Sequence, residues 1–151
     1  MRSFTAERMQ INNVCGDDEL LRAKALAENV LEPIREHFGI PFSPNSWYRC
    51  EELEMFICRK AFTRWRSSHA PNSSPSVAWK RYFDLKSHPK GEAADIEIPG
   101  VSNDELFKWI HDNLEFDQVI REFAKKGDSN SGWVHVSYRQ GNNRHEAFDI
   151  E

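Results

Sequence analysis

The sequence has few cysteines and no long apolar run, and each absence excludes a class of protein. The three cysteines, Cys15, Cys50 and Cys58, are an odd number without CxxC spacing, which argues against a disulfide framework and a cysteine-only zinc site. No stretch approaches the roughly 18 apolar residues that cross a bilayer, and the N-terminal residues lack the pattern of an export signal. We therefore expect cytoplasmic synthesis without a signal peptide, in a reducing compartment, and no membrane partner.

The composition is that of a folded domain with unevenly distributed charge. Of the 151 residues 39% are hydrophobic and 12% aromatic, which suffices for one domain over residues 1–151 with its own core. The net charge is -4, yet residues 59–90 contain eight lysines and arginines against the single acid Asp84. This basic segment is either a solvated face or a surface that binds anions.

Residues 16–39 have the pattern of one long helix. Asp17 or Asp18 is a suitable N-cap, apolar residues recur at helical spacing, and Gly39 stands where the helix should stop. Pro33 interrupts the pattern, because proline lacks the N–H that an inner helical position donates. We expect a kink or a division just before it.

The rest of the chain has the pattern of helices followed by antiparallel strands, which is the α+β class. We expect an edge strand or extended segment over 40–50, a helix over 50–66, a loop over 67–76, a strand over 94–98, a helix over 106–114 begun by a capping box at Ser102, and strands over 116–123 and 132–138. A polar loop separates the last two strands, so they should form a hairpin within a small antiparallel sheet.

The stretch SHPKGEAADIEI, residues 87–98, carries the first candidate for chemistry. His88 and Asp95 lie seven positions apart, and Gly91 between them allows the chain to curl back so that both side chains converge. His135, on a strand expected to be buried, is the best candidate for a third ligand. Two histidines and one carboxylate make a catalytic zinc set with an open position for water; the alternative is that the histidines are structural.

The pattern S-H-x-x-G-x-A-x-D-I resembles the first metal motif of the zinc D-Ala-D-Ala carboxypeptidase family, whose fold is shared with the Hedgehog signalling domain. The segments LEPIREHFGIPFSPNSWYRC, FDQVIREF and WVHVSYR also resemble that family, in the same order along the chain. The resemblance implies an α+β fold in which N-terminal helices pack on one side of a small antiparallel sheet, with zinc in a cleft.

The resemblance also implies a ligand set and a general base. Zinc would be bound by His88, Asp95 and His135, and a glutamate would activate the zinc-bound water. Many relatives hold that acid three residues before the second histidine, where this chain has Gly132. Another arrangement in the superfamily, an acid at the end of the preceding hairpin strand, matches Glu122.

The hairpin register tests this assignment of Glu122. Paired residues on one face of an antiparallel ladder have numbers that sum to a constant, so Glu122 and His135 share a face only if that sum is odd, as when residue 120 pairs with His135. We predict an odd register. If the sum is even, Asp128 and Glu92 are the next candidates for the base.

Two further residues are expected to contact substrate. Arg49 matches the arginine of the family's S-G-Y-R segment, which holds the terminal carboxylate of a substrate by a two-pronged contact; its alternative is a surface ion pair. Ser87 either hydrogen-bonds substrate or caps the turn. The segment between Arg49 and His88 is longer and more basic than in relatives, and it is expected to form one wall of the cleft.

The function that follows is that of a monomeric zinc metallopeptidase. It would hydrolyse peptidoglycan stem peptides at a D-Ala bond, as a D,D-carboxypeptidase or endopeptidase, without binding nucleic acid. A phage holin would release it to the wall as an endolysin, or a virion would carry it. The alternative is a non-hydrolytic zinc-containing binding or phage assembly module of the same fold, and a cysteine hydrolase built on Cys50 or Cys58 is a distant third.

Overall fold

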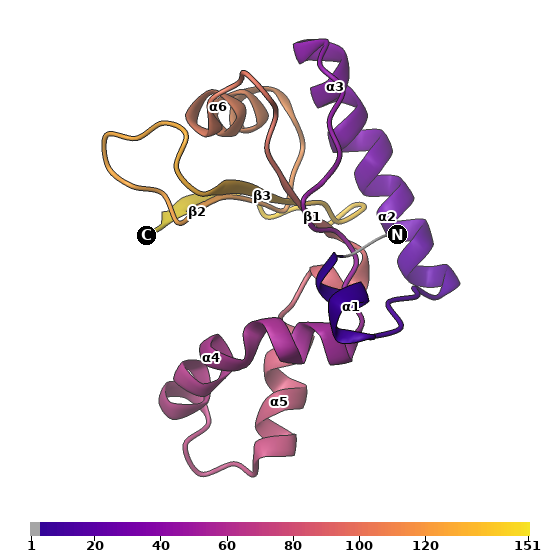
Figure 1. Ribbon diagram of the computed structural model, residues 1–151, viewed down its shortest axis with the longest axis vertical. Coiled ribbons are helices and arrows are strands. Elements are labelled where there is room, and N and C mark those ends of the chain that lie inside the picture. The colour runs from indigo at the N-terminus through magenta and orange to yellow at the C-terminus, as the bar shows by residue number, and fades with distance from the viewer. Residues whose placement is uncertain (1–3) are drawn as a thin grey trace.

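The computed structural model describes residues 4–151 as an α+β fold around a four-stranded sheet (Figure 1). The helices are α1 (Phe4–Met9), α2 (Asp17–Leu26), α3 (Glu32–Phe38), α4 (Glu51–His69), α5 (Pro75–Asp84) and α6 (Asn103–Asn113). A π-helical turn (Ala27–Leu31) joins α2 to α3, and a 3₁₀ turn spans His88–Lys90. The strands are β1 (Ala93–Ile96), β2 (Gln118–Glu122), β3 (Trp133–Ser137) and β4 (Glu146–Ile150). Over residues 4–151, no helix is both long enough and apolar enough to cross a bilayer.

The sheet is mixed, which corrects the prediction of an antiparallel one. The strand order is β1-β3-β2-β4, and β3 pairs antiparallel with both of its neighbours. Strand β4 was not predicted, and it runs parallel to β2. Buried Asp117, just before β2, accepts two hydrogen bonds from Arg144, just before β4. These bonds hold the segment that leads into β4 beside β2. Every residue of β4 is exposed, so it lacks the alternation that marks a half-buried strand.

The two faces of the sheet have different neighbours. Ala94, Val119 and Val136 point toward α2, the π-helical turn, α3 and α6, and this layer forms the main core. The opposite face carries Asp95 and His135, and it looks across a cavity toward the hairpin of α4 and α5. Figure 1 shows this hairpin projecting on the other side of the sheet from α6. The prediction of helices on one side therefore holds for α2 and α3 but not for α4 and α5.

The long N-terminal helix is continuous but changes its winding at the predicted place. The Glu32 N–H donates to the Ala27 carbonyl, five residues back, in the π-helical turn directly before Pro33. The wider turn accommodates a residue without an N–H whose ring would crowd an α-helical carbonyl. Gly39 ends α3 in the left-handed conformation, as predicted. The N-cap is Gly16 rather than an aspartate.

The region before the metal motif differs more from expectation. Residues 40–50 are extended, and only Ser46 forms a bridge, to Asp95 on the edge strand β1. Helix α4 continues to His69, three residues into the predicted loop, and α5, which was not predicted, begins at Pro75, near the end of that loop. Ser74 caps α5 by accepting a hydrogen bond from the Val77 N–H. The signals for α5, a serine N-cap followed by proline at the first helical position, were present in the sequence.

Candidate metal centre

A cluster of three potential metal ligands lies on the face of the sheet opposite the main core. His88, Asp95 and His135 are each buried, and each offers a ligand atom within 4.8 Å of the other two. Asp95 Oδ1 lies 3.2 Å from His88 Nε2 and 2.9 Å from His135 Nδ1. Two donors on one tetrahedral zinc stand roughly 3.3 Å apart, from ligand distances of about 2.0 Å. The cluster could therefore hold a metal ion with little rearrangement.

Local backbone structure brings the three ligands together. Asp95 and His135 are Cα partners in the β1–β3 ladder, so their side chains leave the same face of the sheet. Gly91 ends the 3₁₀ turn with φ of 75°, which lets His88 return to the start of β1. A Cβ at Gly91 would lie 2.3 Å from the Glu19 carbonyl oxygen. The predicted role of this glycine is thus confirmed, and α2 packs tightly against the turn.

Hydrogen-bond chemistry indicates that a cation belongs between His88 and Asp95. His88 Nδ1 lies 2.6 Å from the Trp47 carbonyl oxygen, which can only accept, so Nδ1 carries the proton. In the neutral ring the Nε2 lone pair then faces the carboxylate. Two buried acceptors that face each other require a proton or a metal ion between them.

Burial and charge set the protonation states that metal binding needs. Burial lowers the pKa of His88, although the charge of Asp95 opposes this effect. Burial by itself would raise the pKa of Asp95, but His88 and His135 together hold that pKa well below its ordinary value. Neutral imidazole and ionised carboxylate are the metal-binding forms, and the two lowered pKa values favour these forms at His88 and Asp95.

Arg49 holds the second oxygen of the Asp95 carboxylate. Its Nη2 donates to Asp95 Oδ2 over 2.6 Å, its Nε to the Ser46 hydroxyl and its Nη1 to Glu54. The side chain is only 13% exposed, so the alternative of a surface ion pair does not describe it. The predicted contact between Arg49 and a substrate carboxylate stays a prediction.

Glu54 is a site residue that the sequence reasoning missed. It is 1% exposed, and its carboxylate accepts hydrogen bonds from Arg49 and from the Cys58 thiol. Burial, reinforced by Glu54, raises the pKa of Cys58 to about 12, so the thiol is protonated and a poor nucleophile. In the sequence, Glu54 is an acid that follows Leu53 within the apolar stripe of a helix. Acids next to apolar residues are also common on exposed helix faces, so this pattern did not identify it.

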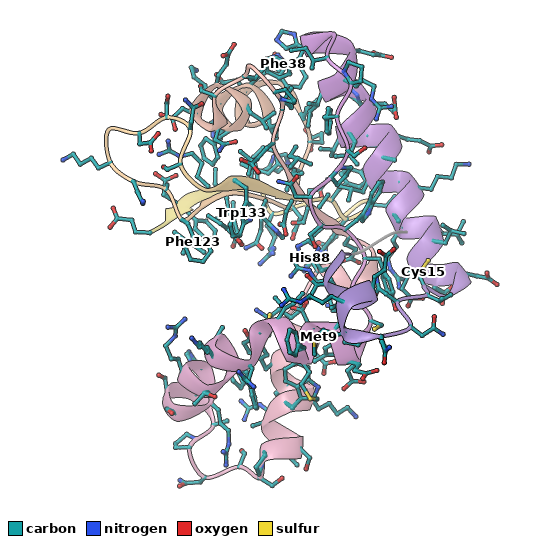
Figure 2. All side chains as sticks on the ribbon, viewed as in Figure 1. Met9, Cys15, Phe38, His88, Phe123 and Trp133 are labelled. Carbon is teal, nitrogen blue, oxygen red and sulfur yellow. The ribbon has the colours of Figure 1, made fainter. Side chains whose placement is uncertain are left out.

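The cluster opens into a cavity of about 480 Å³ between the sheet and the α4–α5 hairpin. The hairpin contributes Glu54, Ile57 and Tyr82 to the lining of this cavity. The sheet contributes Gln118, Ile120, Glu122, Trp133, His135 and Ile150. Figure 2 shows Phe123 and Trp133 below the sheet, on the side that faces the hairpin. The segment before His88 thus forms one wall of the cleft, as the sequence predicted.

The hairpin register has the predicted parity. Ile120 pairs with His135 and Glu122 with Trp133, so the residue numbers sum to an odd constant. Glu122 therefore leaves the same face of the sheet as His135, one diagonal position away, and lines the same cavity. Its carboxylate is partly exposed, which leaves it accessible to water.

Gly132 lies three residues before His135, and its surroundings admit no side chain. Its φ is 66°, and a Cβ would lie 1.8 Å from the Glu122 carbonyl oxygen. An acid at this position would displace the end of β2, the strand that carries Glu122. An acidic side chain at position 132 is therefore incompatible with the observed position of Glu122.

The other candidates from the sequence lie apart from the cluster or beside it. Glu92 points to the far side of β1, where it pairs with Arg139. Asp128 lies in the β2–β3 loop and accepts a hydrogen bond from the Asn130 N–H. Ser87 lines the cavity, and its hydroxyl caps no helix, so only its substrate role stays open.

Comparisons with known proteins identify no family for this chain. A scan against protein-family models, a search of curated proteins and a search of solved structures each returned no match.

Proposed function

We propose that this protein is a zinc metallopeptidase whose site lies in the cavity between the sheet and the α4–α5 hairpin. One observation carries the proposal: in the buried set of His88, Asp95 and His135, Asp95 and His135 share a sheet face with Glu122, and His88 and His135 line the same cavity as Glu122. Zinc held by three protein ligands keeps an open position and supplies Lewis-acid chemistry to water and carbonyl groups.

The chain's own residues supply the remaining functions of a peptidase. Glu122 takes a proton from the attacking water and returns it to the leaving amine, so that the peptide bond and water become a carboxylate and an amine. Arg49 and the Trp47 carbonyl orient Asp95 and His88, as outer-shell partners do in metal sites.

The cavity also offers a donor for the substrate. The Trp133 indole N–H is buried and has no hydrogen-bond partner within residues 4–151. Burying a donor without an acceptor is costly, and a carbonyl of a bound peptide would satisfy it once the ring turns its N–H toward the cavity. Apolar side chains such as Ile57 and Ile150 complete the lining and favour an aliphatic peptide.

The substrate class rests on the resemblance of the motifs and not on the geometry. Peptidoglycan stem peptides that contain D-alanine are the substrates it implies, cleaved as by a D,D-carboxypeptidase or endopeptidase. The segments around Arg49, His88 and His135 carry that resemblance, and the structure brings these three residues to one site.

The experiment measures metal content and cleavage in the same preparations. Wild-type protein loaded with zinc is incubated with purified peptidoglycan, and the products are identified by mass spectrometry. Glu122→Gln should retain zinc and lose roughly 10²-fold or more in rate, since general base catalysis contributes about that much. The matched control is Glu146→Gln, an exposed acid on the neighbouring strand, which should cleave like wild type.

Two outcomes would contradict the proposal. If zinc-loaded wild type releases no peptide product, the non-hydrolytic module of the same fold becomes the better account. If Glu122→Gln cleaves at the wild-type rate, the base lies elsewhere in the cavity, and Glu54 is the other carboxylate among the described residues that line it.

A further inference from the structure

The α4–α5 hairpin carries positive charge that the protein itself leaves unpaired. Five basic residues are exposed on it, namely Arg59, Lys60, Arg64, Lys80 and Arg81. Within residues 4–151 none of these five forms an ion pair. Many basic residues elsewhere do so: Arg22, Lys24, Arg35, Lys108, Arg121, Arg139 and Arg144 each contact a carboxylate, whereas no ion pair forms at Lys125 and Lys126 within residues 4–151.

The unpaired charges lie on exposed positions of the hairpin that do not line the cavity. On α4, the positions that line the cavity are Glu54, Ile57, Cys58 and Ala61. Arg59 and Lys60 lie on the remaining arc of the helix and Arg64 at the border of the cavity-lining stripe, and all three are exposed. On α5, Lys80 and Arg81 are exposed, whereas Ala78, Trp79 and Tyr82 are buried. The hairpin thus contributes a wall to the cavity and carries exposed basic residues outside it.

The aromatic side chains of the hairpin are used for its own packing. The rings of Phe62, Trp79 and Tyr82 contact one another, and Trp65 lies against Tyr82. Within residues 4–151, Phe56 is the only exposed aromatic side chain of the hairpin, with an exposed fraction of 44%. Surfaces that bind single-stranded nucleic acid stack successive bases on aromatic rings. This surface instead suits a ligand that is recognised by its charge.

We propose that the exposed basic residues of the α4–α5 hairpin, Arg59, Lys60, Arg64, Lys80 and Arg81, bind a polyol-phosphate polymer of the bacterial wall. The choice of the wall as the source of the phosphate rests on the proposed function. Lysine and arginine recognise phosphate through charge-assisted hydrogen bonds, and successive phosphodiesters of a flexible polymer can each meet one such residue.

The charge distribution orients the protein on such a polymer. The whole chain has a net charge of -4 while the hairpin region is strongly basic, so the remainder repels an anionic surface and the hairpin is attracted to it. Because the same hairpin lines the metal cavity, binding holds the cavity close to the wall.

Binding of purified poly(glycerol phosphate) to the zinc-loaded full chain tests the proposal. The variant Arg59→Gln/Lys60→Gln/Arg64→Gln removes three unpaired charges. The matched control, Lys24→Gln/Lys125→Gln/Lys126→Gln, removes three charges from exposed positions outside the hairpin. We expect the hairpin variant to lose at least tenfold in affinity at low salt and the control less than about threefold. The slope of log affinity against log salt should fall by roughly two in the hairpin variant, because each phosphate contact releases counterions.

Equal losses in the two variants would overturn the proposal, since binding would then follow net charge alone. So would tighter, hairpin-dependent binding of single-stranded DNA with the same number of phosphates, which would assign the surface to nucleic acid. Cleavage of a short soluble stem peptide separates this test from the proposed function. That rate should be the same in wild type and both variants. A chain that binds the polymer as expected but never cleaves the peptide contradicts the peptidase and leaves the polymer-binding surface supported.

Discussion

Replacing Gly132 by alanine should destabilise the protein through one backbone contact. The φ of Gly132 is 66°, and an added Cβ would lie 1.8 Å from the Glu122 carbonyl oxygen and 2.9 Å from the Phe123 carbonyl carbon. The positive φ costs an L-residue about 1–2 kcal/mol. Relieving the overlap requires the backbone at the end of β2 to move, and overpacking of this kind costs a further ~1–3 kcal/mol. We therefore expect a total loss of about 2–5 kcal/mol.

Gly127 offers a matched control in the same β2–β3 loop. Its φ is 84°, and a Cβ there would meet no atom within 4 Å. Gly127→Ala should therefore cost only the conformational part, about 1–2 kcal/mol. In a domain of this size each kcal/mol lowers Tm by roughly 2–4 °C. Thermal unfolding followed by circular dichroism should place the Tm of Gly132→Ala several degrees below that of Gly127→Ala.

The same pair of variants tests the placement of Glu122. Movement of the Glu122 carbonyl should shift its side chain in the cavity, so Gly132→Ala should lose peptidase rate at temperatures where it is still folded, and Gly127→Ala should not. Equal Tm values for the two variants would refute the reasoning, because the close contact at Gly132 would then have no energetic consequence.

The remaining predictions concern the metal site and its surroundings. Asp95→Asn should abolish zinc binding in equilibrium dialysis, because it removes the only charged ligand of the cluster; retained stoichiometric zinc would contradict the ligand set. Arg49→Met should lose about 3–5 kcal/mol in urea unfolding, since Glu54 and Asp95 would both be buried without their cation, and Arg49→Met/Glu54→Met should recover only the part due to Glu54. Because burial raises the pKa of Cys58 to about 12, iodoacetamide at pH 9 should modify this thiol more than tenfold faster in unfolded than in folded protein. The raised pKa also means that its contribution to stability is present below about pH 9 and is lost as pH rises toward 12, which urea titrations across that range would detect.

The sequence predicted those parts of the site that depend on local pattern. The spacing of His88 and Asp95 around Gly91, and the Ser102 cap of α6, are each encoded within a dozen residues; the structure brings the first pair together and has the Ser102 hydroxyl accept from the Glu105 N–H. The odd register of β2 and β3 was also predictable, because burying one face of the hairpin fixes which residues point together. Glu122 follows from that register.

Other parts depended on contacts that no local pattern reveals. Strand β4 pairs with β2 only because the chain returns after Asp117 binds Arg144, and its exposed residues give no periodic signal. Glu54 looks like any acid on a helix until the fold places Arg49 beside it. Long-range pairing of this kind is decided by tertiary structure and not by propensity.

The buried pair of Arg49 and Glu54 explains how the hairpin keeps its place beside the metal centre. Arg49 joins Asp95 on β1 to Glu54 on α4 through two nitrogens of one guanidinium. A buried ion pair adds little net stability, because desolvation offsets the attraction, but each misplaced partner leaves an unpaired charge at a cost of several kcal/mol. Any other position of the hairpin would incur this cost, so the ion pair favours the observed position. Since the same guanidinium also holds a metal ligand, a displacement of α4 would reach Asp95 directly. The cavity wall and the ligand set are therefore coupled through Arg49, and a polymer bound to the exposed basic residues of the hairpin would act on the site through this contact.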